Sequence, residues 1–230
     1  MGANPRILLA GFELKMYIPH QFSVTDWQEI TDFAASVRAA DLVTVDGSGV
    51  PQATLMPFVW DQSNASEGSH GKLVMHMARA NPQWKTIASG APSLAIVRGP
   101  QAYVSPTNYE RKLTDHKVVP TWNYQSLHFT GTVEVSEDKE LLRAIVTDLT
   151  SLHEKTRAKP WSVSEADESY IELELKAIVA VTLHITRVEA KFKLSQNRSH
   201  EDQERVIADL AHSHISGEQE VAAQMKRLQP

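Results

Sequence analysis

The chain has 230 residues, 22% of them charged, with a formal net charge of −5 and no cysteine. This length suffices for one large domain with a sizeable core, and the acidic balance gives no electrostatic argument for general nucleic acid binding. The lack of cysteine excludes disulfides, thiolate catalysis and cysteine-bound metal centres. No apolar run reaches the roughly 20 residues that a membrane helix needs.

Residues 1–15 contain only a brief apolar patch, from Ile7 to Phe12, which is too short for the core of a secretory signal. We interpret residues 1–15 as a tail before a domain that begins near Met16. A cytoplasmic protein without membrane association is therefore expected.

The first helix is predicted within residues 23–41, where apolar side chains recur with helical spacing. Thr25 and Gln28 have the spacing of a capping box at its start. Two strand-like runs follow, at residues 42–46 and 52–60. The Gly-Ser-Gly turn between them indicates a β-hairpin.

A polar loop is predicted at residues 61–71, followed by a strand at residues 72–77. Asn81, Pro82 and Gly90 then have the positions of a helix N-cap, a first helical residue and a residue just past the helix end. This pattern predicts a short helix after the strand.

Three further strand-like runs occupy the middle of the chain. The runs 93–99 and 102–105 are separated by Gly99-Pro100. The third, residues 126–135, has Gly131 in its interior, which predicts a bulge or a close approach of backbone.

The last third of the sequence begins with a strongly amphipathic helix at residues 137–153. A helical turn from Ser164 to about Leu173 and a β-branched strand at residues 177–189 follow. Two helices end the chain, with a break predicted at Ser216-Gly217. Six or seven strands with a few helices and no regular βαβ alternation predict an α+β fold around a mostly antiparallel sheet or barrel.

The stretch HMARANPQWK, residues 76–85, ends an apolar strand with an unusual number of polar groups. A helix that starts at Pro82 would direct its free N–H groups at the preceding turn. Arg79 lies just before that terminus and Lys85 about one turn inside it. Such a set of donors and cations is suited to a phosphate. The alternative interpretation is an ordinary basic turn.

Two aromatic segments follow. Tyr103 and Ser105 share one face at a strand exit, where they would either bind a ligand or belong to a half-buried strand end. Residues 119–128 are predicted to form an exposed loop. Its Trp122 and Tyr124 would either pack on their own domain, or lie in an interface or on a planar ligand.

A run of hydrogen-bond donors, residues 191–202, precedes the last helices. It contains Lys193, Gln196 and Asn197. Either Ser199 or Asn197 suits the N-cap of the next helix, so a structural role competes with a ligand-binding one.

Several kinds of site are excluded. The ten histidines show no metal-binding spacing, no GxSxG elbow supports a serine hydrolase, and no GxGxxG motif follows a strand. From residue 200 onward there are three basic and six acidic residues, a balance that disfavours a DNA-recognition helix. No metal site is expected, and no catalytic residue is assigned.

Five separated blocks nevertheless resemble one family in order, residue content and spacing: MYIPHQF, LVMHMARANPQWK, GPQAYVSPTNY, VPTWNYQSLHFTG and KFKLSQNR. This is the PaiB family of FMN-binding proteins, often described as negative transcriptional regulators. The resemblance runs from about Met16 to Leu210. It implies a six-stranded antiparallel split β-barrel with peripheral helices at residues 16–198, a C-terminal helical segment at residues 199–230, and a homodimer with FMN at the subunit interface.

The same resemblance implies roles for individual residues. The FMN phosphate and ribityl chain would be bound around His76, Met77, Arg79 and Lys85, with Arg79 and Lys85 as the anion-binding side chains and Thr54 as a further donor. Tyr103 and Ser105 would lie near the flavin. Contributions across the dimer interface would come from Trp122, Asn123, Lys193, Gln196 and Asn197.

The leading expectation is therefore a dimeric FMN-binding protein that regulates transcription through flavin or metabolite sensing, since the acidic chain shows no DNA-reading element. The alternative is a flavin-dependent oxidoreductase or flavin reductase, in which His76 or His128 is a candidate acid or base. A haem-binding or haem-degrading split-barrel protein is a third option.

Overall fold

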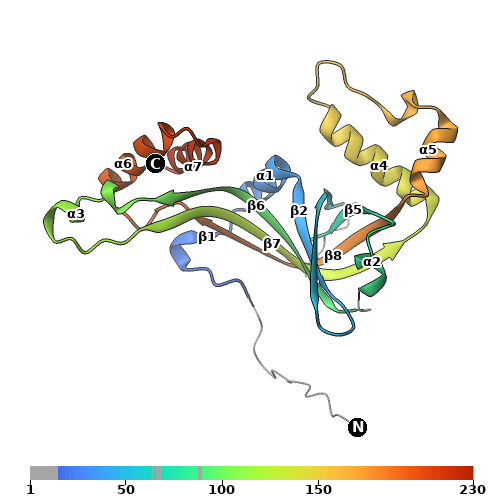
Figure 1. Ribbon diagram of the computed structural model, residues 1–230, viewed down its shortest axis with the longest axis horizontal. Helices are drawn as coiled ribbons and strands as arrows, with labels where there is room; N and C mark the ends of the chain where they lie inside the picture. The colour runs from blue at the N-terminus through green and yellow to red at the C-terminus, as the bar shows by residue number, and fades with distance from the viewer. Residues whose placement is uncertain (1–14, 64, 66–68, 88–89, 230) are drawn as a thin grey trace, which may run out of the picture.

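The computed structural model describes residues 15–63, 65, 69–87 and 90–229, which are built around one curled antiparallel sheet (Figure 1). Six strands of seven or more residues form its body: β2 (Ala39–Val45), β3 (Pro51–Pro57), β5 (Lys72–Ala78), β6 (Pro92–Val104), β7 (Thr121–Ser136) and β8 (Ile178–Lys193). The two short strands are β1 (Ser23–Val24) and β4 (Val59–Asp61). The predicted split barrel is confirmed as a half-barrel.

The strand order is β3-β2-β6-β7-β8-β5-β4, and β1 also pairs with β8. Alternating residues of the strands turn inward and form the main core, which includes Leu42, Met75 and Phe129. Helix α1 (Trp27–Val37) packs on this core, where Phe33 lies edge-on to Phe192 with ring centroids 4.8 Å apart. Its N-cap is Asp26, whose carboxylate accepts from the Glu29 N–H, so the predicted Thr25 cap is wrong by one residue.

Strand β6 is continuous where a break was predicted, because Gly99-Pro100 is absorbed as a register shift between Arg98 and Gln101. A Cβ at Gly99 would lie 2.6 Å from the Phe33 ring, which explains the glycine. The predicted bulge at Gly131 is confirmed by a register shift after Thr130. A Cβ there would lie 1.9 Å from the His184 carbonyl oxygen.

The loop predicted at residues 119–128 is wrong, because β7 begins at Thr121. This part of the strand has polar residues, Asn123 and Gln125, on its buried side and aromatic residues, Trp122 and Tyr124, on its other side. The usual alternation of apolar-in and polar-out is therefore inverted, which hides the strand from a periodicity argument.

The predicted helix after β5 is only one turn, α2 (Gln83–Thr86), so it ends well before Gly90. Helix α4 (Lys139–Glu154) matches its prediction, with Asp138 as N-cap. The helical turn predicted from Ser164 divides into η3 (Val163–Glu165) and α5 (Glu168–Leu175), because Asp167 caps a new helix by accepting from the Tyr170 N–H.

The last two helices are α6 (His200–Ala211) and α7 (Ser216–Arg227). Ser199 caps α6, as predicted, by accepting from the Asp202 N–H. The break lies earlier than predicted, because the Ser213 hydroxyl accepts from the Ile215 N–H and turns the chain before Ser216 starts α7.

Figure 1 shows that α6 and α7 lie over one end of the long strands and that α4 and α5 lie at the other end. Short elements complete the connections: η1 (His20–Phe22), η2 (Pro106–Asn108) and α3 (Arg111–Thr114). Residues 1–14, interpreted above as a tail, lie outside the described residues, as do residues 64 and 66–68 of the predicted polar loop. Within the described part of the chain, no helix combines the length and apolarity that a membrane crossing needs.

Candidate functional site

The outward-facing side chains of β6, β7 and β8 form a continuous polar and aromatic surface, which we call the outer face. On β7 the alternate residues Leu127 and Phe129 are buried in the core, while their neighbours face out. The antiparallel register places Ser126 between Arg98 and Lys191, and His128 between Ile96 and Glu189. Directly paired residues share a face, so the outer face includes Arg98, Tyr103, Trp122, Tyr124, Ser126, His128, Thr130, Thr132, Arg187, Glu189, Lys191 and Lys193.

A cavity of about 600 Å³ opens at one end of the outer face. Its floor is formed by the three strands, and the segment at Met16 passes along its side. The strand residues that line it are Pro92, Ser93, Leu94, His128, Thr130, Gly131, Thr132, Thr186, Arg187 and Glu189.

Charge in this cavity centres on Glu189. One carboxylate oxygen accepts from the Met16 N–H at 3.0 Å, and the other accepts from Arg187 Nε at 3.2 Å. His128 lies directly across from Glu189 in the register. Burial lowers the pKa of His128, while the charge of Glu189 opposes that effect. A neutral imidazole beside a carboxylate can exchange hydrogen bonds or a proton with a molecule bound in the cavity.

Aromatic side chains are exposed at the opposite end of the outer face. Tyr103 and Trp122 are 46% and 48% exposed, with ring centroids 6.4 Å apart. The Trp122 indole N–H donates to Gln101 Oε1 at 3.0 Å, which fixes the ring. Fixed rings that remain half exposed are suited to stacking on a planar group.

Two lysines add positive charge at this end of the outer face. Lys191 is only 8% exposed; its ammonium donates to the Tyr17 carbonyl and lies 5.4 Å from the ring centroids of both Tyr17 and Tyr124. Lys193 donates to the Trp122 carbonyl at 2.7 Å. Burial lowers the pKa of Lys193, and the charges of Lys191 and Arg198 lower it further.

Three of the predicted site residues near this end, Asn123, Gln196 and Ser105, have structural contacts of their own. Asn123 is fully buried on the other side of β7, and its amide donates to Ser195 Oγ at 2.9 Å. Gln196 bonds back to its own loop through Leu194 N and Phe192 O. Ser105 caps η2 by accepting from the Thr107 N–H, and Asn197 is exposed.

A polar network surrounds α2 and includes the predicted residue Thr54. The Thr54 hydroxyl donates to Gln83 Oε1 at 2.5 Å and accepts from Asn81 Nδ2 at 2.9 Å. The Gln83 amide also donates to the Leu42 carbonyl at 3.1 Å and to Thr44 Oγ1 at 3.0 Å. Gln83, which is 2% exposed, was missed in the sequence because its role depends on strands 30 to 40 residues away.

The two cations predicted for a phosphate differ in their surroundings. Lys85 is exposed, with its ammonium 5.2 Å from the Trp84 ring centroid. Arg79 instead joins β5 to β8: it donates to the carbonyls of Lys176 and Ile178 at 2.7 and 3.1 Å and pairs with Glu137. All three guanidinium nitrogens therefore have partners in the chain. The single turn of α2 is also too short to act as the helix N-terminus expected there.

His76 and Met77 alternate along β5 and so face opposite sides of the sheet. Met77 is buried in the main core. His76 faces a different cavity, between the sheet and the α4–α5 pair, and its Nδ1 is buried without a hydrogen-bond partner. Burial lowers the pKa of His76.

The predicted site residues thus form two groups within one chain. Thr54 and Lys85 lie near α2, whereas Tyr103, Trp122 and Lys193 lie at the far end of the outer face. Thr54 pairs with Leu42, which pairs with Ala95, and Ala95 and Tyr103 are eight positions apart on β6, which corresponds to about 26 Å of strand. Within the described residues, no group of three or more His, Asp or Glu side chains is arranged to hold a metal ion.

Residues 16–187 match the model of a family described as "Putative FMN-binding domain". The protease synthase and sporulation protein PAI 2 of Bacillus subtilis is 33% identical over 211 residues, which cover 92% of this chain and 97% of the relative. An uncharacterized protein of Emericella nidulans is 32% identical over 185 residues, or 68% of this chain and 74% of the relative.

Two solved structures share the fold. The FAD and heme binding protein of Mycobacterium smegmatis has a TM-score of 0.55 and 22% identity, over 78% of each chain. The flavocytochrome Anf3 of Azotobacter vinelandii has a TM-score of 0.50 and 17% identity, over 82% of this chain and 77% of that one. At these identities the likeness concerns the fold alone.

Proposed function

The chain belongs to the PaiB family of FMN-binding domains, and from this premise we propose that it binds FMN on the outer face, between two copies of the chain. The observation that carries the proposal is the separation of the predicted residues into two groups at opposite ends of a long strand pair. A two-fold partner, packed with its strands reversed, would bring the Lys85 end of one copy to the Trp122 end of the other.

The residues present fit a flavin in type and exposure. The half-exposed rings of Tyr103 and Trp122 offer a surface for a planar ring, and the exposed ammonium of Lys85 offers a partner for a phosphate. We assign the phosphate to Lys85 rather than to Arg79, because the guanidinium of Arg79 is already engaged by Glu137 and two carbonyls. When bound, FMN would supply redox chemistry that the side chains lack.

We further propose that the chain has the regulatory role implied by its resemblance to the PaiB family, and that it acts through flavin or metabolite binding rather than direct DNA reading. The C-terminal helices are packed into the main core. Two of their three basic residues are engaged within the chain: Arg205 with Asp202, and Arg227 with Glu29. This leaves little free positive charge for phosphates of a duplex.

One observation favours an oxidoreductase as the second candidate function. His128, which is kept neutral by burial, lies across from Glu189 in a cavity large enough for a small substrate. A pair of this kind can hold or deliver a proton beside a flavin that transfers electrons.

The experiment that tests the flavin proposal is complementation between defective variants. We expect Trp122→Ala and Lys85→Ala each to weaken FMN binding at least tenfold, measured by flavin fluorescence, while Arg79→Ala and the control Trp161→Ala leave it unchanged. After the two defective variants are unfolded and refolded together, about one quarter of the sites should recover, because a mixed dimer contains one intact site out of two.

Different outcomes separate the alternatives. Loss of binding without recovery on mixing would place the flavin within one copy and contradict the shared site. A Soret band on haem titration, with no FMN binding, would favour the haem option. Steady NAD(P)H consumption by the FMN-loaded protein, abolished by His128→Gln, would favour the oxidoreductase. Salt-sensitive binding to promoter DNA in a gel-shift assay would contradict the proposal that the protein does not read DNA directly.

A further inference from the structure

A second cavity, of about 250 Å³, lies between the sheet and the α4–α5 pair, and we call it the α4–α5 cavity. It belongs to a separate hydrophobic cluster, in which Leu142, Ile145 and Leu149 of α4 pack with Leu175 and Ala180. The sheet is therefore packed on both sides at β5 and β8. The cavity is a gap in the cluster between the sheet and the α4–α5 pair. Its walls are Val146 and Thr150 of α4, Ile171 and Leu175 of α5, and Val163 and Ile178.

One polar atom in this apolar gap has no partner. Nδ1 of His76 is buried in the cavity floor without a hydrogen bond from any described residue. Unpaired buried polar atoms are uncommon in folded proteins and costly, because the atom has lost its water. Burial also lowers the pKa of His76, so the ring is neutral near pH 7. A hydroxyl group of a bound molecule would satisfy Nδ1 in either tautomer.

The edge of the cavity has a different character. Trp161 is 44% exposed there, and the carboxylate of Glu174 is exposed beside it. Among the described residues, the Glu174 side chain has no hydrogen-bond or ion-pair partner. An aromatic face together with an unpaired carboxylate favours a cation over an anion.

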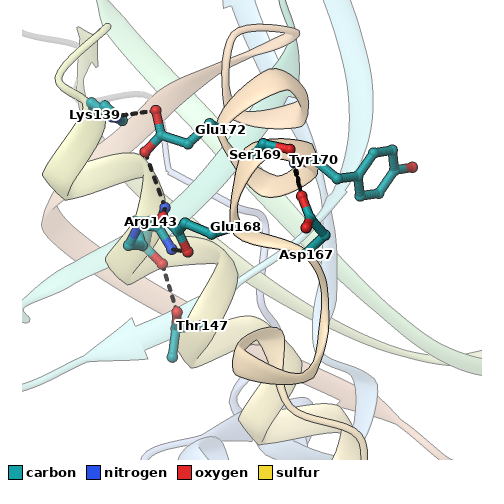
Figure 2. A network of polar contacts seen from close by, with 8 residues as sticks. All are labelled: Lys139, Arg143, Thr147, Asp167, Glu168, Ser169, Tyr170 and Glu172. Atoms are coloured by element: carbon teal, nitrogen blue, oxygen red, sulfur yellow. Dashed lines mark hydrogen bonds and ion pairs between the residues drawn. The ribbon is translucent and has the colours of Figure 1, made fainter.

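The wall helices are held together by a network of polar contacts (Figure 2). Arg143 of α4 pairs with both Glu168 and Glu172 of α5, and Lys139 pairs with Glu172 from the adjacent turn. Asp167 caps the start of α5. These contacts fix the separation of the helices, and they neutralise two of the acidic residues of α5 while leaving Glu174 at the cavity edge.

We propose that the α4–α5 cavity binds a small phenol with an alkylammonium arm, whose ring occupies the apolar space, whose hydroxyl bonds His76 Nδ1, and whose ammonium lies between Glu174 and Trp161. This site is separate from the outer face, because none of the residues that line it belongs to the outer face or to the large cavity there. It therefore goes beyond the flavin proposal and gives the protein a second ligand to which it responds.

The probe is tyramine, a phenol with an ethylammonium arm, titrated into the full chain by calorimetry. We expect saturable one-to-one binding. Phenethylamine, which lacks the hydroxyl, should bind at least tenfold more weakly, and 4-hydroxyphenylacetate, which reverses the charge, should also bind at least tenfold more weakly. Binding of all three with equal strength, or no saturation by tyramine up to millimolar concentration, would overturn the proposal.

Substitutions in the α4–α5 cavity test the tyramine site independently of FMN binding. His76→Leu should weaken tyramine binding at least tenfold, and Val146→Trp, which fills the space from the α4 side, should abolish it. The matched control is His184→Leu on β8, since His184 is exposed and paired with Glu134. Circular dichroism of each variant verifies folding. Unchanged binding in both cavity variants, or displacement of tyramine by saturating FMN, would overturn the proposal.

Discussion

The two ends of the long sheet are each covered by a pair of helices, but the pairs are attached in different ways. Val206, Leu210, Val221, Ala222 and Met225 of the α6–α7 pair belong to the main core. The α4–α5 pair has its own hydrophobic cluster on the opposite side of β5 and β8. The first pair closes the core, whereas the second forms an additional layer.

The difference also appears in the polar groups. Under α7, Asn123 is bonded to Ser195 and contacts the sulfur of Met225, so the buried amide is paired. Under α4 and α5, the imidazole of His76 has a buried unpaired nitrogen beside open space. Gln125 Nε2, near α7, is also buried without a partner among the described residues, so the α6–α7 end is not fully satisfied either. What leaves room for a ligand at the other end is the apolar open space beside His76.

The largest expected effect tests whether the main core and the α4–α5 cluster unfold together. Met225→Ala and Leu149→Ala should each cost about 2–5 kcal/mol of local packing free energy, because both side chains are buried. We expect Met225→Ala to lower protection from hydrogen exchange throughout the sheet, and Leu149→Ala to lower it mainly in α4 and α5. Equal loss of protection in β6 and β7 for both variants would contradict the comparison.

A smaller effect is expected from the paired amide. Asn123→Ala leaves the Ser195 hydroxyl without its partner and should lower the free energy of unfolding by about 1–3 kcal/mol in urea titrations. FMN affinity should stay within twofold, since Asn123 faces the core rather than the outer face. A selective loss of FMN binding at unchanged stability would instead support the interface role implied by the family resemblance.

The unpaired imidazole should appear in the pH dependence of stability. Burial lowers the pKa of His76 in the folded state, so the unfolded chain binds more protons below its ordinary pKa of about 6.5. Stability is therefore full above that pH and falls on acidification toward the lower folded pKa. We expect His76→Leu to flatten the slope of melting temperature between pH 6.5 and 5.5, and an unchanged slope would contradict the expectation.

The smallest effect is expected from the ion pairs between α4 and α5. Arg143→Gln removes contacts to Glu168 and Glu172 that are largely at the surface, so the loss in stability should be under about 1 kcal/mol. The effect should shrink further at 1 M salt. A loss of tyramine affinity at an unchanged melting temperature would show that the ion pairs position the cavity walls rather than stabilise the fold.

The sequence predicted the parts of the fold whose signals are local. The stripe along α4 and the glycine of the β7 bulge both follow from residue type and spacing. The start of β7 was missed because Asn123 and Gln125 point inward and are polar. Periodicity arguments assume an apolar inner side, so they fail where the inward-facing side chains of a strand are polar.

The candidate site was predictable in residue types but not in arrangement. Trp122 and Lys85 were identified from their residue types, and both side chains are accessible to solvent. The role of Arg79 was ambiguous, because its partners Glu137 and Ile178 lie 58 and 99 residues away. The pairing of His128 with Glu189 likewise depends on strand register, which the sequence alone does not give.

Strand β8 has a consequence for synthesis of the protein. It joins β7 to β5 and also pairs with β1, although it begins only at Ile178. A growing chain on the ribosome therefore presents β5, and later also β7, without the strand that lies between them until β8 has been made. Exposed strand edges of this kind invite aggregation. We expect the nascent chain to depend on chaperones until β8 has emerged from the exit tunnel.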